Sequence, residues 1–558
     1  MNNNDLVSKL WKLCDNLRDG GVSYQNYVNE LASLLFLKMC KETGQEEDLL
    51  PKGYRWDDLK KKMGQEQHQF YRKLLVQLGD DNHAIVRAIF QNANTTIREP
   101  KQLTELVSNM DSLDWYDNDG TGKSRDDFGD MYEGLLQKNA NETKSGAGQY
   151  FTPRSLISTI VELIKPQPRE IIQDPAAGTA GFLIEADKYI KAQTNDLDEL
   201  PLDDQEFQRT KAFVGLELVP ETRRLALMNC LLHDIEGDEN EGAIRLGNTL
   251  GSAGESLPKA NVILTNPPFG SAASTNITRT FVHPTGNKQL CFIQHIYDAL
   301  EPGGRAAVVI PDNVLFEGGK GTEIRRDLMD KCNLHTILRL PTGIFYAQGV
   351  KTNVLFFQKG TPENPMQDKG CTKEIWVFDM RTNINTFGKR RPLTDKHFEA
   401  FIAAYGEDPN GQSPREEGVY HTEGAIYAEG TDSVEHVIDN ARWRKFSREY
   451  IRDQKGDSLD ISWLKDLEAT SAENLPEPDV LAGEAMAELT EAMSELYQLM
   501  QALGANDEAQ AQKQLIEEAF GLEEREEKGE QEEKGEQEEQ VLDPREAILE
   551  CDTQEAKA

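Results

Sequence analysis

The residues best suited to chemistry are Asn266, Pro267, Pro268 and Phe269, which follow the apolar run 262–265. The side-chain carbonyl of Asn266 and the backbone carbonyl of Pro267 can both accept hydrogen bonds from one ligand, and Pro268 has no N–H to compete for them. Phe269 offers a face on which a flat ring can stack. This set suits a planar ligand with an exocyclic amino group, such as adenine. Hydrogen bonds from both amino hydrogens would localise the nitrogen lone pair and help it to attack an electrophilic methyl group.

A second set of residues has the pattern of a nucleotide-binding turn. An expected strand ends at Asp174, and Gly178, Thr179, Ala180 and Gly181 precede an expected helix, so a ligand can approach the backbone closely. The turn has no P-loop lysine and does not have the G-x-G-x-x-G spacing. Taken alone, it is weak evidence for a binding site.

Glu217 is the candidate for the acidic residue that binds the ribose of a nucleotide held at such a turn. It ends the next expected strand, 212–218, and a carboxylate there can accept hydrogen bonds from both hydroxyls of a ribose. The gap from the turn is about 40 residues, against roughly 20 in the dinucleotide-binding fingerprint. The polar stretch 193–207 can loop out to account for the difference. We therefore expect an adenosine-like ligand, with no sign of a second nucleotide or of a metal.

The elements that must position these residues alternate between short apolar runs and helical stretches. This alternation predicts an α/β domain with a doubly wound, mostly parallel sheet, in which ligands bind at the carboxyl ends of the strands. Helices are expected at 155–164, 221–234 and 290–300. The expected strands are 170–175, 212–218, 243–248, 261–266, 305–311, 334–341 and 352–359.

The rest of the chain divides by composition. Apolar residues at helical spacing in 24–40 and 68–79 predict a helical N-terminal domain. Met486, Leu489, Met493, Leu496, Met500 and Leu503 recur at heptad spacing, which indicates a helix that packs on a partner or on its own domain. The expected domains are 1–145, helical; 146–400, catalytic; 401–480, a linker and basic segment; 481–520, C-terminal partner-docking helices; and 521–558, an acidic low-complexity tail with the repeat "EEKGEQ".

Charge and cysteine usage limit the class of protein. The 558 residues carry a net charge of −36, which taken alone disfavours nucleic acid as a partner, but residues 501–558 hold 19 Asp and Glu against 6 Lys and Arg. The basic segment 441–452 could contact DNA, or it could be a helix that packs Trp443 and Phe446 inward. Seven cysteines without a C-x-x-C pair, no membrane span and no secretory signal point to a reducing cytoplasm.

With these motifs in place, the sequence resembles the modification (M) subunits of type I restriction–modification enzymes, and most closely their K-type (IA) group. The resemblance covers nearly the whole chain, including "SGAGQYFTPR" (145–154), "QDPAAGTAGFL" (173–183), "TNPPFG" (265–270) and "LRLPTGIFYAQGVKTNVLFF" (338–357). It implies an adenine-N6 DNA methyltransferase that uses S-adenosylmethionine. It also implies an assembly of two M subunits with one specificity (S) subunit, to which restriction (R) subunits add.

The resemblance also implies roles for individual residues. The tetrapeptide 266–269 resembles the catalytic motif, and Glu217 resembles the ribose acceptor. The implied cofactor-binding residues are Gly148, Gln149, Tyr150, Phe151, Thr152 and Pro153, which close over the methionine end, with Asp174, Gly178, Thr179 and Ala180 at the turn. Two features depart from the pattern: Asn248 stands where many such enzymes have an acid, and the "EEKGEQ" repeat looks like an addition.

Other functions fit the tetrapeptide as well. A protein-glutamine N5 methyltransferase presents a planar amide to a similar site, and cytosine-N4 methylation usually goes with serine at the first position. A non-catalytic assembly subunit is a further alternative, but it would not need the glycine turn, Glu217 and the tetrapeptide together. The length of the chain and the extent of the resemblance favour the DNA adenine methyltransferase.

Overall fold

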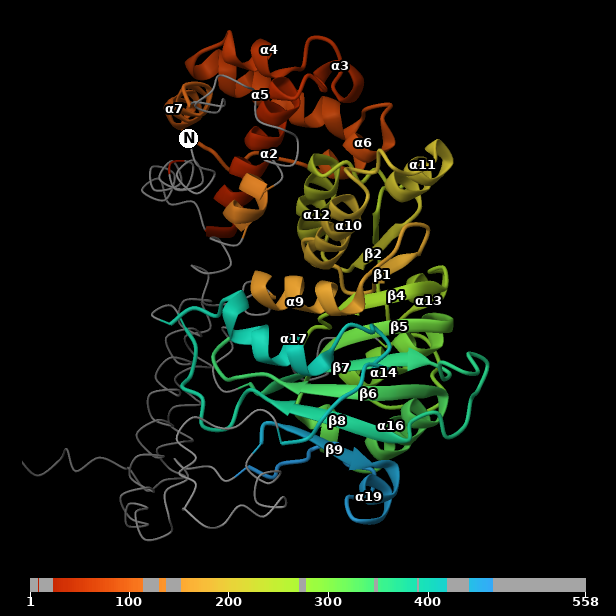
Figure 1. The fold of residues 1–558 in the computed structure, drawn as a ribbon. Helices are drawn as coiled ribbons and strands as arrows, with labels where there is room; N and C mark the ends of the chain where they lie inside the picture. The colour runs from red at the N-terminus through yellow and green to blue at the C-terminus, as the bar shows by residue number, and fades with distance from the viewer. Residues whose placement is uncertain are drawn as a thin grey trace, which may run out of the picture. The chain divides into compact units, whose positions relative to one another are not determined.

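The computed structural model describes residues 9, 24–113, 130–136, 152–269, 277–345, 350–388, 391–418 and 441–464 (Figure 1). The chain divides into two compact units, Met1–Leu467 and Glu468–Ala558, and every described residue belongs to the first. Gly148, Gln149, Tyr150 and Phe151, the heptad segment 486–503 and the acidic repeat lie outside the described residues. The expected domain boundaries stay predictions.

The described N-terminal part is helical, as the apolar spacing predicts. Both expected helices are present, and the second begins at residue 64 rather than at 68. Trp56 is fully buried, and its indole N–H donates to the Asp111 carboxylate at 2.9 Å. The helices are α2 (Tyr24–Glu42), α3 (Glu46–Leu49), α4 (Trp56–Lys60), α5 (Gly64–Gly79), α6 (Ala84–Phe90) and α7 (Pro100–Asp111).

The following residues form a nine-stranded sheet in the order β3-β2-β1-β4-β5-β7-β6-β8-β9 (Figure 1). The pairs among β1 to β5 are parallel, whereas β7 and β9 run antiparallel to their neighbours. The strands are β1 (Ile172–Asp174), β2 (Phe213–Glu217), β3 (Ile244–Leu246), β4 (Ala260–Thr265), β5 (Leu300–Pro311), β6 (Cys332–Arg339), β7 (Thr352–Lys359), β8 (Glu374–Asp379) and β9 (Trp443–Ser447).

Helices cover both faces of this sheet, because successive side chains of its buried strands point to opposite sides. Val262 and Leu264 join the core that includes residues of α9 and α17, whereas Ile263 joins the core of α14 and α16. The helices are α9 (Arg154–Ile164), α10 (Gly181–Gln193), α11 (Leu202–Thr210), α12 (Pro220–Leu232), α13 (Ser252–Glu255), α14 (Lys288–Ala299), α15 (Asn313–Phe316), α16 (Lys320–Lys331), η3 (Asp395–Phe398), α17 (Glu399–Tyr405) and α19 (Arg448–Asp453).

The seven expected strands and the three expected helices are confirmed, with shifts of a few residues at most ends. Strand β5 begins five residues earlier than expected, and the polar stretch 193–207 holds most of α11. The sequence analysis missed β8 and β9. These two strands extend the sheet beyond β6.

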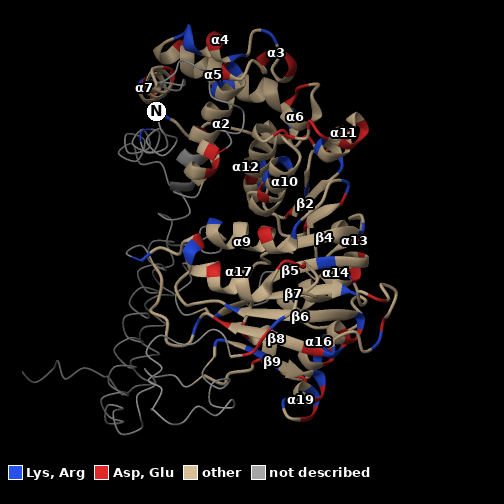
Figure 2. Ribbon diagram, viewed as in Figure 1, with Lys and Arg blue, Asp and Glu red and all other residues tan. Residues whose placement is uncertain are grey.

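The basic segment 441–452 packs against the sheet, but it does so as β9 followed by the short helix α19. Trp443 and Phe446 are 1% and 7% exposed. The segment's cations have nearby partners: Lys445 lies 3.5 Å from Glu374, and Arg448 lies 2.7 Å from Asp457. Figure 2 shows blue and red segments side by side on α19. This pairing favours packing over DNA contact as the role of the segment.

No helix among the described residues is both long and apolar enough to cross a membrane. Five cysteines of the described part are buried: Cys40, Cys230, Cys291, Cys332 and Cys371.

Candidate active site

The glycine turn and the tetrapeptide meet where the strand order reverses. From β1 the chain adds β2 and β3 on one side and then returns to place β4 on the other side. Gln173 of β1 pairs with Ile263 of β4, and the two strands are parallel. Asp174 and Asn266 come after these paired residues, so both lie toward the carboxyl ends of their strands. In open α/β sheets, this switch point is where ligands bind.

The glycine turn, residues 178–181, has the backbone of a close-approach site. Gly178 has a φ of +54°, and a Cβ added there would meet no atom within 4 Å. Ala180 has a φ of +69°, a left-handed conformation that costs energy for a residue with a side chain. At Gly181, a Cβ would come within 3.1 Å of Ile157 on α9. The turn therefore has free space on its Gly178 side, which fits a ligand, and packs tightly against α9.

Glu217 ties the end of β2 to this turn. Its carboxylate accepts hydrogen bonds from the Gly178 N–H at 3.0 Å and from the Val219 N–H at 2.8 Å. Burial raises the pKa of Glu217, and these backbone hydrogen bonds oppose that rise. An ionised carboxylate has about four lone-pair sites, so the two bonds still leave acceptor capacity for ribose hydroxyls.

Asp174 is the most deeply buried acid of the site, with 2% of its surface exposed. Its carboxylate accepts a hydrogen bond from the Ala176 N–H at 3.0 Å. Burial raises the pKa of Asp174 to about 7, opposed by the Thr265 hydroxyl and the Ala176 N–H and assisted by the charge of Glu217. A carboxyl group with this pKa changes its charge near neutral pH.

The tetrapeptide 266–269 is held by side chains from two other elements. The Asn266 Nδ2 donates to the Thr152 Oγ1 at 2.9 Å, just ahead of α9. Gln289, on α14, donates to the Pro268 carbonyl at 3.3 Å. The sequence analysis missed Gln289, because its partner is 21 residues away and no spacing rule connects them.

Phe269 is 5% exposed, and it forms a T-shaped pair with the Phe345 ring, with the ring centroids 5.6 Å apart. Phe345 follows β6, within a segment that the resemblance covers but to which the sequence analysis gave no role. Because Phe269 is almost fully covered, stacking of a base on it would require a neighbouring group such as Phe345 to move. Its signal in the sequence was an aromatic residue beyond the end of an expected strand.

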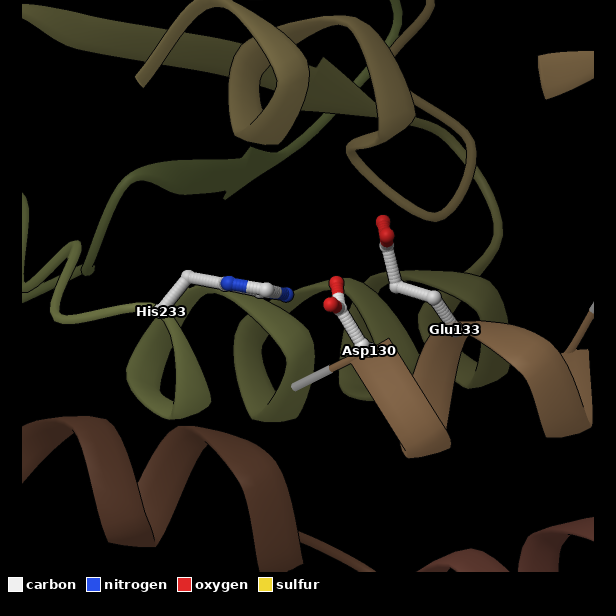
Figure 3. Close-up of side chains that lie close together, drawn as sticks. All are labelled: Asp130, Glu133 and His233. Carbon is white, nitrogen blue, oxygen red and sulfur yellow. The ribbon is translucent and has the colours of Figure 1, made fainter. Parts of the chain in front are cut away.

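A cluster of charged side chains, with Glu133 and His233 buried and Asp130 exposed, is connected to the glycine turn. Asp130 and Glu133 on one helical segment point toward His233, which follows α12 (Figure 3). Lys188 donates to both carboxylates, and Arg154 also pairs with Glu133. Since two cations already neutralise these carboxylates, the donor set does not fit a metal ion.

The same cluster supports the turn directly. The Asn229 side chain, on α12, donates to the Thr179 carbonyl at 3.0 Å and lies 3.5 Å from a Glu133 carboxylate oxygen. Asn229 and Glu133 thus connect the cluster to the glycine turn, although neither stood out in the sequence.

The remaining candidates are placed as follows. Thr152 and Pro153 precede α9, with Pro153 as its N-cap residue. The Asn248 Oδ1 accepts a hydrogen bond from the Leu250 N–H at 3.0 Å, so this side chain stabilises its own turn at the end of β3. That bond gives Asn248 a local structural role in addition to any contact with a ligand.

Three family models match the chain. The model for N-6 DNA Methylase matches residues 123–440, more than half of the sequence. The HsdM N-terminal domain matches residues 6–110, and the C-terminal domain of the type I restriction enzyme methylase subunit matches residues 475–518. The acidic repeat lies beyond the last of these matches.

Relatives and solved structures agree with these models. The chain is 73% identical to the type I restriction enzyme EcoKI methylase subunit of Escherichia coli K12, over 93% of this chain and 99% of that protein. A crystal structure of the EcoKI M protein has a TM-score of 0.55 and 67% identity, and the match covers 93% of this chain and 100% of that one. A second solved structure comes from work on the complex assembly and conformational transition of the type I restriction–modification system. It has a TM-score of 0.63 and 26% identity, and the match covers 91% of this chain and 99% of that one. The chain therefore belongs to the family of type I restriction enzyme methylase subunits, within the N-6 DNA methylases.

Proposed function

We propose that this chain transfers a methyl group from S-adenosylmethionine to the N6 atom of adenine in DNA, as the M subunit of a type I restriction–modification enzyme. The observation that carries the proposal is the juxtaposition at the switch point. Asn266 of the tetrapeptide follows β4, and the glycine turn follows the neighbouring strand β1. The same edge of the sheet thus carries an acceptor for the target amine and a turn that fits a nucleotide-like cofactor.

The residues assigned to S-adenosylmethionine are those that line the turn and the strand ends. Glu217 accepts hydrogen bonds from the ribose, and the free space at Gly178 admits the ligand to the backbone. When bound, the cofactor supplies a methyl group on a positively charged sulfur that carries its own leaving group. The set that the resemblance implies is Gly148, Gln149, Tyr150, Phe151, Thr152, Pro153, Asp174, Gly178, Thr179, Ala180 and Glu217.

The tetrapeptide is assigned to the target base. Because adenine inside a duplex is out of reach, the base is flipped out at a cost of a few kcal/mol, and stacking on Phe269 recovers roughly 1–3 kcal/mol. The Asn266 Oδ1 and the Pro267 carbonyl accept the two amino hydrogens, which localises the nitrogen lone pair. Pro267 and Pro268 restrict the backbone, so the acceptors are already positioned before the base arrives.

The proposed partners follow from the same family. They are DNA, one specificity subunit and a second M subunit, which together form the methylase, and restriction subunits, which complete the restriction complex in the cytoplasm. The protein-glutamine N5 methyltransferase and the non-catalytic subunit are set aside, because the family model matched over 123–440 is that of DNA methylases. Asn266 also favours adenine over cytosine as the target.

Methyl transfer tests this proposal directly. The chain is co-purified with its specificity subunit and incubated with labelled S-adenosylmethionine and DNA from a host that lacks the system. We expect label in N6-methyladenine after nuclease digestion. Label in cytosine or in protein, or no transfer by the intact complex, would overturn the proposal.

A further inference from the structure

We propose that Thr152 is a positioning residue that fixes the plane of the Asn266 carboxamide, so that its carbonyl oxygen meets the target amine. The inference rests on the proposed function and adds a residue that acts through Asn266. The sequence analysis assigned Thr152 only to the segment that closes over the methionine end of the cofactor. The hydrogen bond from Asn266 to Thr152 points to this different task.

The bond joins two distant parts of the chain. The Asn266 Nδ2 donates to the Thr152 Oγ1 at 2.9 Å, and the two residues are 114 positions apart in sequence. Thr152 precedes α9, whereas Asn266 follows β4. Both residues are partly buried, so this bond is less open to exchange with water than a bond on the surface. Such a contact is well placed to determine a side-chain orientation.

The chemistry of a carboxamide explains why its orientation matters. The group carries a donor and an acceptor on one planar centre, and rotation about its terminal bond exchanges them. A target amine needs the oxygen, since it has two hydrogens to donate. With Nδ2 bonded to the Thr152 hydroxyl, Oδ1 occupies the other arm of the amide plane. A misplacement of about 1 Å at a reacting group can cost on the order of 100-fold in rate.

Thr152 is itself held firmly enough for this task. Pro153 follows it as the N-cap residue of α9, and the proline ring restricts the backbone there. Arg154 begins the helix and forms an ion pair with the buried Glu133. The Arg154 Nη1 also lies 3.5 Å from the position of a Cβ added at Gly181. The hydroxyl is therefore placed by a helix start that packs against the glycine turn.

Two roles of Thr152 predict different kinetics. If the hydroxyl serves mainly the cofactor, its loss weakens cofactor binding, and a saturating cofactor concentration restores the rate. If it positions Asn266, its loss lowers the rate at saturation and leaves cofactor affinity nearly unchanged. A merely structural role would lower the rate at saturating cofactor, the cofactor affinity and the thermal stability together.

The test uses the full chain in complex with its specificity subunit. Thr152→Val removes the hydroxyl at nearly constant shape, and Thr152→Ser retains it. We measure the dissociation constant of S-adenosylmethionine by calorimetry and the single-turnover rate of DNA adenine methylation at saturating cofactor. For Thr152→Val we expect the rate to fall by about 10- to 100-fold, with the dissociation constant within about threefold of wild type. Thr152→Ser should keep the rate within about threefold.

Thr152→Ala compared with Thr152→Ser gives a second pair that differs only by the hydroxyl, which covers the case in which Thr152→Val does not fold. A wild-type rate in Thr152→Val or Thr152→Ala would overturn the positioning role, and so would a loss that saturating cofactor restores. The unmodified complex is assayed first. Failure of its adenine methylation would overturn the proposed function, whereas normal methylation by both wild type and variants would overturn only the role of Thr152.

Discussion

In the proposed mechanism, Asn266 contacts the target base and the glycine turn contacts the cofactor. We predict that Asn266→Ala lowers methylation by at least about 100-fold, by analogy with the loss of one polar group that stabilises a transition state. Cofactor affinity should stay within about threefold, since the side chain acts on the target amine. Calorimetry with S-adenosylmethionine measures this affinity, and a loss of binding would move Asn266 to the cofactor site.

Gly178→Val should have the opposite pattern, with a loss of cofactor binding. A branched side chain is strained at a φ of +54° and would occupy the free space beside the turn. The same calorimetry measures the effect. If Gly178→Val retained wild-type affinity, the cofactor pocket would have to lie elsewhere.

Asp174 links the site to the pH dependence of stability. Burial raises its pKa to about 7, whereas in an unfolded chain an aspartate has a pKa of about 3.9. The native state therefore binds this proton more tightly, and stability falls as the pH rises from about 4 to about 7. The difference between the two pKa values corresponds to a loss on the order of 4 kcal/mol.

Asp174→Asn should remove this penalty, since an amide oxygen can still accept the Ala176 N–H and carries no charge. We expect the variant to melt at a higher temperature than wild type without cofactor, with a difference that is larger at pH 8 than at pH 5. Thermal unfolding of both proteins at the two pH values measures this. An equal difference at both would rule out titration of Asp174 as its cause.

The residues of the site were predictable from sequence only where each belongs to a short contiguous motif. Asn266, Gly178 and Glu217 each stand in a motif whose spacing has a physical meaning, and the structure brings them to one edge of the sheet. Gln289 and Phe345 contact the tetrapeptide from elements far along the chain. No local pattern encodes such contacts, because they depend on how α14 and the segment after β6 pack.

At the scale of elements, the sequence predicted strands β1 to β7 and missed β8 and β9. The apolar runs of β1 to β7 are separated by turns and helical stretches, so each stands out. Strand β9 lies far from its partner β8 in sequence and contains Arg444 and Lys445, so its pairing depends on tertiary structure. The charges of the segment 441–452 suggested a DNA-binding role, although Lys445 and Arg448 both pair with nearby acids.

Asp457 anchors the segment that follows β9. Its carboxylate lies 2.7 Å from both Arg326 and Arg448, and its side chain is 2% exposed. We predict that Asp457→Asn lowers the free energy of unfolding by about 1–3 kcal/mol, because Arg448, which is 15% exposed, loses its ionic partner, whereas water can hydrate the 55% exposed Arg326. An asparagine tolerates the φ of +64° at this position, so the change tests the charge and not the backbone.

The matched control is Asp453→Asn, which removes the exposed partner of Arg452 a few residues away. Since both side chains of that pair are more than half exposed, solvent screens the pair and we expect no measurable change. Chemical denaturation of wild type, Asp457→Asn and Asp453→Asn measures their free energies of unfolding. A similar stability for Asp457→Asn and wild type would mean that the segment is not anchored by this cluster.

For the whole molecule, the net charge of −36 is a poor guide to its partners. Residues 501–558, with 6 Lys and Arg against 19 Asp and Glu, contribute −13 of this charge, and the matched C-terminal family domain ends at residue 518. We predict that truncation after Gly521 leaves assembly with the specificity subunit and methylation unchanged, because the repeat has little apolar surface to bury. Co-purification and methyl transfer measure both properties. A loss of either would give the repeat a function.

The heptad segment 486–503 should dock the specificity subunit. It lies outside the described residues, within the matched C-terminal domain, and its narrow apolar stripe is half methionine, which suits a surface that adapts to a partner. We predict that Leu489→Asp with Leu496→Asp blocks binding of the specificity subunit, since both changes put a charge into the seam. The isolated double variant should keep its wild-type melting temperature and cofactor affinity, because the core clusters of the described residues, which run from residue 31 to residue 461, do not include this segment. If the double variant still co-purifies with the specificity subunit, the stripe packs within the M subunit itself.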